Sequence, residues 1–264
     1  MSRAELQSRG GRTFTRTSFR NGLIRHDVYV GGSGPPVILI HELGGLGMPA
    51  LDVADRLCEA GFRVLLPSLV GRAGSPGSLL GTMGNGAWLC ISWEVHVLLA
   101  GRTSPIATWL RALARREKGS YAGVGVVGMC FSGGFALAAA VDDAVIAAVA
   151  SQPALPWKSL PGTDADLGLS KSDVACVRRR YAAGEFGIVA ARYTGDTKSP
   201  KARIERYRKE FGTDVVFEPT GTEHSVLARA ACPPDPEGKA IGHDPLAVPA
   251  LHATIALLTE RLKS

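Results

Sequence analysis

The segment from Gly119 to Val141 limits most strongly how this chain can fold, because it contains no charged residue. Its length alone would allow it to span a bilayer. We nevertheless predict a buried strand over 124–127, a sharp turn over 128–133 and a helix over about 134–140 instead of a membrane span. The basis for this choice is the set of glycines at positions 123, 125, 128, 133 and 134, with Cys130 and Ser132 among them.

Other apolar runs predict further strands of a mostly parallel sheet. Val37-Ile38-Leu39-Ile40 is continuously apolar, as is typical of a strand that is buried on both faces. Because predicted strands and helices alternate along the chain, we predict an α/β fold with helices on both faces of the sheet. The remaining strands are expected at 62–66, 145–151, 188–193 and 215–218, and the other helices at 50–60, 104–118, 201–211 and 245–262.

An antiparallel hairpin is predicted before the first parallel strand. Residues 13–20 and 23–30 are two β-compatible runs around Asn21-Gly22, the dipeptide that best tolerates the two positive φ angles of a type I′ turn. Residues 67–92 and 152–186 are predicted as long insertions, the second with irregular and helical parts. Long insertions of this kind often shape a site.

Composition and charge indicate one globular domain. The chain has 264 residues, of which 45% are hydrophobic, and this is enough to bury a sizeable core. We predict a single domain over residues 13–264, after a polar N-terminal segment, residues 1–12, that need not be ordered. The formal charge of +6 is spread along the chain without a recognition motif, so no nucleic-acid partner is expected. The N-terminus lacks an apolar signal segment, which makes the cytoplasm the expected location.

The clearest signal for chemistry is the run Gly128-Met129-Cys130-Phe131-Ser132-Gly133-Gly134, between a predicted strand and a helix of small residues. This is the context of a nucleophile elbow, in which small residues let strand and helix approach on either side of the nucleophile. Cys130 occupies the nucleophile position, where the positive end of the helix dipole favours a thiolate. The other cysteines form no CxxC pair and are interpreted as packing residues: Cys58, Cys90, Cys176 and Cys232.

A thiolate nucleophile needs a histidine that transfers protons and an acid that orients this histidine. Asp196 and His224 each follow a predicted strand, so both are expected at the carboxyl ends of the strands, where ligands bind. The order nucleophile, acid, histidine is that of α/β-hydrolases. Other candidates lie in less suitable places, in the hairpin, after a long loop, after the elbow helix or near the last helix: His26, His96, Asp142, Asp143, His243 and His252.

The loop His41-Glu42-Leu43-Gly44-Gly45 follows the first parallel strand and is predicted to complete the site. In α/β-hydrolases, one backbone N–H from this loop and one from the residue after the nucleophile hold the oxyanion. These would be the amides of Leu43 and Phe131. Glu42 is unusual here, because a carboxylate beside an oxyanion hole would repel the developing negative charge.

Together these motifs, with Thr194-Gly195-Asp196 and Glu223-His224-Ser225, resemble the dienelactone hydrolase family over roughly residues 20–262. The resemblance implies an α/β-hydrolase fold with a triad of Cys130, His224 and Asp196, and it implies no metal or organic cofactor. It also implies a role for Glu42, which in this family interacts with the resting thiol and moves away when substrate binds. The chain departs from the family at Ser132, where glycine is usual. Because serine is still small, the elbow is expected to survive, but contact with substrate is expected to change.

Substrate-binding residues are harder to predict. The arginines that bind substrate in the family have no firm counterpart, although Arg72, Arg102 and Arg229 lie near loops that are expected to form the site. Three tryptophans in the two long insertions are expected either to form an apolar wall of the pocket or to have a structural role: Trp88, Trp93 and Trp157.

These observations predict a cysteine-dependent hydrolase of an ester or lactone bond in a small-molecule metabolite, acting through a thioacyl-enzyme intermediate. Two alternatives use the same fold. The same thiolate, histidine and acid could catalyse cyclisation, isomerisation or elimination in a dry pocket, and a binding protein without activity could share the fold. The expected partner is a small-molecule substrate, with no membrane association, and the chain is expected to be a monomer or a homodimer.

Overall fold

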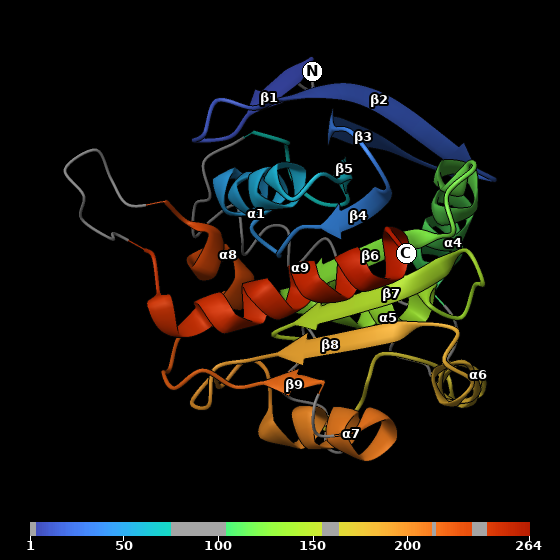
Figure 1. Cartoon of the computed structure of the whole chain (residues 1–264), viewed down its shortest axis with the longest axis vertical. Helices are drawn as coiled ribbons and strands as arrows, with labels where there is room; N and C mark the ends of the chain where they lie inside the picture. Colours follow the sequence, from blue (N-terminus) through green and yellow to red (C-terminus); the bar gives the residue numbers. More distant parts are fainter. Residues whose placement is uncertain (1–3, 75–103, 155–163, 213–214, 234–241) are drawn as a thin grey trace.

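The structure is a computed structural model that describes residues 4–74, 104–154, 164–212, 215–233 and 242–264 (Figure 1). Several residues considered in the sequence analysis lie outside the described residues: Trp88, Trp93, Trp157, Arg102, His96 and Cys90.

The described residues form one sheet with the strand order β1-β2-β3-β5-β4-β6-β7-β8-β9. Strands β4 to β9, which lie in the spatial order β5-β4-β6-β7-β8-β9, run parallel to one another. Strands β1, β2 and β3 are antiparallel to their neighbours. The predicted fold class is confirmed. The strands are β1 (Glu5–Gln7), β2 (Thr13–Asn21), β3 (Ile24–Gly32), β4 (Pro36–Ile40), β5 (Arg63–Pro67), β6 (Val124–Met129), β7 (Val145–Ser151), β8 (Gly187–Ala191) and β9 (Val216–Phe217).

Helices cover both faces of this sheet (Figure 1). α1 (Met48–Glu59), α8 (Val226–Ala231) and α9 (Val248–Leu262) cover one face, and α8 packs against both α1 and α9. α4 (Pro105–Lys118), α5 (Gly133–Ala139), α6 (Lys171–Ala182) and α7 (Lys201–Phe211) contribute to the core on the other face. Two short 3₁₀ turns, η2 (Cys130–Ser132) and η3 (Pro245–Ala247), precede α5 and α9.

The central strands are apolar because both of their faces are covered. Every residue of β4, β6 and β8 is buried, as expected for parallel strands between two helical layers. The uncharged segment around β6 therefore forms the predicted strand, turn and helix. No helix among the described residues has both the length and the apolar character needed to cross a membrane.

The predicted hairpin is confirmed, but its turn type is wrong. Asn21 pairs with Ile24, so the two residues of the turn are Gly22 and Leu23 and not Asn21 and Gly22. Gly22 has a φ of 59°, whereas Leu23 is not among the residues with positive φ. A turn with positive φ at its first central residue only is of the II′ kind, which places glycine at that position.

The N-terminal segment carries a strand that the sequence analysis did not predict. β1 pairs with β2, and two arginines that follow it form ion pairs with acids on α1. Nη1 of Arg9 is 2.6 Å from Oδ2 of Asp52, and Nε of Arg12 is 2.7 Å from Oδ1 of Asp55. These contacts attach the N-terminal segment to the face of the sheet that α1 covers.

Candidate active site

Cys130 lies at a sharp turn between β6 and α5. Its φ angle is 60°, in the left-handed region that residues other than glycine rarely adopt. Gly128 makes this turn possible, because a Cβ at that position would lie 2.1 Å from the carbonyl oxygen of Ser132. The chain thus forms a strained strand-to-helix turn at the predicted place, with the half-buried Cys130 at its apex.

Ser132 is fully buried and stabilises this turn. Its hydroxyl accepts a hydrogen bond from the N–H of Met129 (2.8 Å). It can donate to the carbonyl oxygens of Met129, Ile40 or His41, at 2.8, 3.1 and 3.2 Å. The expectation that Ser132 alters contact with substrate is therefore wrong, because the hydroxyl faces the backbone and links the turn to the end of β4.

Replacing Ser132 by alanine should destabilise the fold. The change leaves the buried N–H of Met129 without its acceptor, so we expect Ser132→Ala to lower the free energy of unfolding by about 1–3 kcal/mol. Urea denaturation measures this, and Ser120→Ala, at an exposed turn, is the matched control with an expected change below about 0.5 kcal/mol. An unchanged unfolding midpoint for Ser132→Ala would show that the turn does not depend on this hydroxyl.

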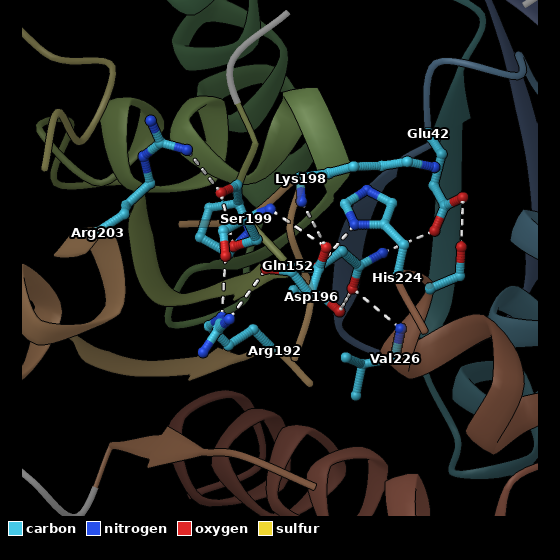
Figure 2. A network of polar contacts seen from close by, with 12 residues as sticks. Glu42, Gln152, Arg192, Asp196, Lys198, Ser199, Arg203, His224 and Val226 are labelled. Atoms are coloured by element: carbon cyan, nitrogen blue, oxygen red, sulfur yellow. Dashed lines mark hydrogen bonds and ion pairs between the residues drawn. The ribbon is translucent and has the colours of Figure 1, made fainter. Parts of the chain in front are cut away.

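The imidazole of His224 lies beside Asp196 (Figure 2). His224 is in the loop that follows β9, and Asp196 is in the loop that follows β8. Nδ1 of His224 is 2.7 Å from Oδ2 of Asp196. Asp196 is buried, and only 14% of the His224 side chain is exposed. Because a carboxylate oxygen only accepts hydrogen bonds, Nδ1 carries the proton in this pair. This is the arrangement in which an acid orients a histidine for proton transfer.

Backbone contacts hold Asp196 in place. Its Oδ1 accepts hydrogen bonds from the N–H groups of Lys198 (2.8 Å) and Ser199 (3.3 Å). The buried Arg192 donates to the carbonyl oxygens of Asp196 (2.9 Å), Ser199 (2.9 Å) and Thr194 (3.1 Å). Sequence analysis missed Arg192, although a charged residue directly after the buried strand β8 was a usable signal.

The charge state of His224 depends on its neighbours. Burial by itself lowers the pKa of His224, but hydrogen bonding to Asp196 and Cys130, with the negative charge of both, raises the pKa to about 10. Among the described residues the buried Nε2 has no hydrogen-bond partner, although Cys130 lies close enough to raise the pKa of His224. The stability that protonated His224 contributes is present in full below about pH 6.5 and is lost as pH rises through about 10.

His41 fixes the loop that follows β4. It is fully buried, and its Nε2 accepts a hydrogen bond from the N–H of Leu69 (3.0 Å), so Nδ1 holds the proton and donates to the carbonyl oxygen of Glu42 (2.7 Å). Burial lowers the pKa of His41 to about 4, which keeps the ring neutral at neutral pH. The predicted oxyanion amides, those of Leu43 and Phe131, belong to neighbouring loops because β4 pairs with β6.

Two side chains that sequence analysis missed hold the carboxylate of Glu42. Nε2 of Gln152 donates to Oε1 of Glu42 at 2.7 Å (Figure 2). Oγ of Ser225 donates to Oε2 of Glu42 at 2.8 Å. Burial is the largest influence and leaves the pKa of Glu42 raised, although both hydrogen bonds and the charges of His224 and Lys198 favour the carboxylate and oppose this rise. The available signal for Gln152 was its position directly after an apolar strand, at the edge where ligands bind.

A cleft of about 570 Å³ lies beside His224 and Asp196. Arg229, one of the predicted substrate-binding residues, lines this cleft together with His224 and Asp196, and Cys130 is not among the described residues that line it. Arg72 is exposed after β5 and does not line it. Across the described ranges, no group of three or more His, Cys, Asp or Glu side chains is arranged to hold a metal ion.

The alternative candidates make other contacts. His26 lies on β3 against the ring of Trp109, with ring centroids 5.2 Å apart. Asp142 pairs with Arg115, and Nδ1 of His243 contacts the carbonyl oxygen of Cys232. Asp143 is exposed, and His252 is exposed on α9. Among the other cysteines, Cys58 and Cys232 are buried and Cys176 is half-buried.

The model of the Dienelactone hydrolase family matches residues 26–164. A search of curated proteins finds no match. Among solved structures, a predicted dienelactone hydrolase from Klebsiella pneumoniae is 17% identical, with a TM-score of 0.62 and coverage of 94% of this chain and 98% of that chain. A dienelactone hydrolase-like promiscuous phosphotriesterase from metagenomic libraries is 20% identical, with a TM-score of 0.60 and coverage of 95% and 99%.

A dienelactone hydrolase from Anabaena variabilis is 16% identical, with a TM-score of 0.57 and coverage of 95% of this chain and 99% of that chain. At these identities the solved structures show a shared fold. The match to the family model covers more than half of the sequence and includes the loop after β4 and the turn at Cys130.

Proposed function

The chain belongs to the dienelactone hydrolase family, and from this premise we propose that it hydrolyses an ester or lactone bond in a small-molecule metabolite through a thioacyl intermediate on Cys130. The proposal is supported most directly by one arrangement. Cys130 lies on a strained turn beside His224, and Asp196 together with Cys130 raises the pKa of His224. A thiolate next to an imidazolium can attack a carbonyl carbon without a separate deprotonation step.

In the first half-reaction, the sulfur of Cys130 attacks the carbonyl carbon, and the π electrons of the C=O bond move to the oxygen. The N–H groups of Leu43 and Phe131 stabilise the resulting oxyanion. When the tetrahedral intermediate collapses, the bond to the leaving oxygen breaks, and His224 donates its Nε2 proton to that oxygen. The acyl group remains on Cys130 as a thioester.

In the second half-reaction, water attacks the thioester. Neutral His224, oriented by Asp196, accepts a proton from this water while the water oxygen bonds to the carbonyl carbon. The bond between carbon and sulfur then breaks, and Cys130 leaves as a thiolate beside the protonated imidazole. The carboxylic acid product departs, and the protonation state is the same as at the start.

Mass spectrometry of the intact chain, quenched in acid shortly after mixing with p-nitrophenyl acetate, tests this proposal. We expect an added acetyl group, because acylation of an activated ester outpaces hydrolysis of the thioester and the intermediate accumulates. Peptide mapping should locate the acetyl group on Cys130, and p-nitrophenol should appear in a burst before the steady state.

Cys176→Ser removes a half-buried thiol outside the site and is the matched control, since it should leave acetylation unchanged. Sustained release of p-nitrophenol with no acetyl group on Cys130, or with the group on another residue, would contradict the thioacyl intermediate.

A further inference from the structure

Gln152 has an unusual backbone conformation, although it is not the nucleophile, the acid or the base of the proposed triad. Its φ is 34°, and its side chain is fully buried. In the described part of the chain, Cys130 is the only other non-glycine residue with a positive φ. Met129 lies opposite Ser151 in the pairing of β6 with β7, so Cys130 and Gln152 each follow directly after paired strand ends. Strain of this kind persists only where the surroundings enforce it, and it often marks a functional position.

The contacts of Gln152 determine which end of its amide faces Glu42. Oε1 of Gln152 accepts a hydrogen bond from the N–H of Val226 at 3.2 Å and another from the hydroxyl of Ser151. A backbone N–H only donates, so the amide oxygen must lie on that side and the NH₂ group on the other. This orientation directs Nε2 to Oε1 of Glu42, as Figure 2 shows.

Ser225 provides the second donor to the same carboxylate, and we call Gln152 and Ser225 the Glu42 clamp. Each oxygen of the carboxylate accepts one hydrogen bond, which favours the ionised form and restricts the direction of the side chain. The cations that face Glu42 are His224, from the loop after β9, and Lys198, from the loop after β8. Burial is the largest influence on Glu42 and raises its pKa, and the groups that oppose this rise are the two clamp residues and these two cations, not Cys130.

The direction of this carboxylate matters for the thiol. Glu42 follows β4 and Cys130 follows β6, and these two strands are neighbours in the sheet. A carboxylate beside the sulfur would accept a hydrogen bond from the thiol and would oppose a second negative charge, so the thiol would stay protonated. A carboxylate on the clamp leaves the sulfur to pair with His224.

We propose that the Glu42 clamp holds the carboxylate of Glu42 on Gln152 and Ser225 and not on the thiol, so that the sulfur of Cys130 is already paired with His224 before any substrate binds. The clamp adds a positioning step to the proposed function. It rests on the proposed function in one respect, which is that Cys130 is the nucleophile. It also differs from the behaviour implied by the family resemblance, in which the glutamate leaves the thiol when substrate arrives. Gln152 and Ser225 are positioning residues, because they act on the thiol through Glu42.

The rate at which iodoacetamide alkylates Cys130 tests the proposal, because only the thiolate reacts. Peptide mapping separates Cys130 from the other cysteines. Gln152→Met keeps the side-chain length but removes the donor, and should lower the rate at about pH 6 roughly tenfold. The double variant Glu42→Ala/Gln152→Met should return the rate to within about twofold of wild type.

Ser225→Ala removes the second donor without altering the strained backbone, so it keeps the test valid if Gln152→Met fails to fold. Ser225→Ala should slow alkylation at about pH 6 roughly threefold. The matched control for Gln152→Met is Gln7→Met, which makes the same change at an exposed position on β1. Wild-type rates in both clamp variants, or a double variant as slow as Gln152→Met, would overturn the proposal. Alkylation needs no ester, so a chain that alkylates as expected but hydrolyses no ester would refute the proposed function and leave the clamp standing.

Discussion

Cys130→Ala should lower kcat for p-nitrophenyl acetate by at least about 10⁴-fold, because alanine offers no atom that can form the acyl intermediate. The nearby hydroxyl of Ser132 cannot substitute, since it is buried and bonded to the backbone of the turn and of β4. Alanine can adopt the same strained φ as cysteine, so the turn should persist. Steady-state kinetics, with the spontaneous hydrolysis in buffer subtracted, measures the loss.

The matched control is Cys176→Ala, which removes a half-buried thiol outside the site and should keep wild-type kcat. Urea denaturation of Cys130→Ala checks that the fold is intact, with an expected change below about 1 kcal/mol in the free energy of unfolding. If Cys130→Ala kept about a tenth of wild-type kcat, another group would have to be the nucleophile.

Asp196→Asn should lower kcat by about 10³–10⁴-fold through a change of tautomer in His224. Two backbone N–H groups bind Oδ1 of Asp196, so the carbonyl oxygen of asparagine must take that place and its NH₂ group must face Nδ1 of His224. An NH₂ group cannot accept a proton, so Nδ1 must be unprotonated and the imidazolium loses its partner. The same change removes one cause of the raised pKa of His224, which should fall toward 6.5.

Two measurements check this second expectation. Steady-state kinetics gives the fall in kcat, and NMR titration of His224 gives its pKa in both chains. Asp143→Asn, at an exposed position after α5, makes the same chemical change elsewhere and should alter neither quantity. A fall in kcat below about tenfold, or an unchanged pKa, would contradict the role of Asp196.

Elements with strong local signals were predicted from the sequence to within one or two residues. Ser104 before Pro105 predicted the start of α4, and the hydroxyl of Ser104 does accept a hydrogen bond from the N–H of Ile106. The loops after apolar strands predicted the region that brings Asp196 and His224 together, because parallel strands end at one edge of a sheet. These inferences needed only local periodicity and chain order.

Features that depend on distant contacts could not be predicted in the same way. The Glu42 clamp joins residues from the ends of three different elements, and only the register of β6 and β7 places Gln152 level with Cys130. The direction of the Ser132 hydroxyl depends likewise on the backbone of β4, far away in the sequence. In the hairpin, the pairing of Asn21 with Ile24 moved the turn by one residue, a shift that the dipeptide alone does not specify.

The strand order also has a consequence for the kinetics of folding. The β2–β3 hairpin forms from neighbouring residues, whereas β6 must enter the sheet between β4 and β7 after a long loop has closed. Glu42 follows β4 and Cys130 follows β6, so the pairing of β4 with β6 is needed to bring these two residues together. His224 lies nearer the C-terminus than either of them. Recovery of activity after dilution from denaturant should therefore follow the last parallel pairings, well after the hairpin has formed.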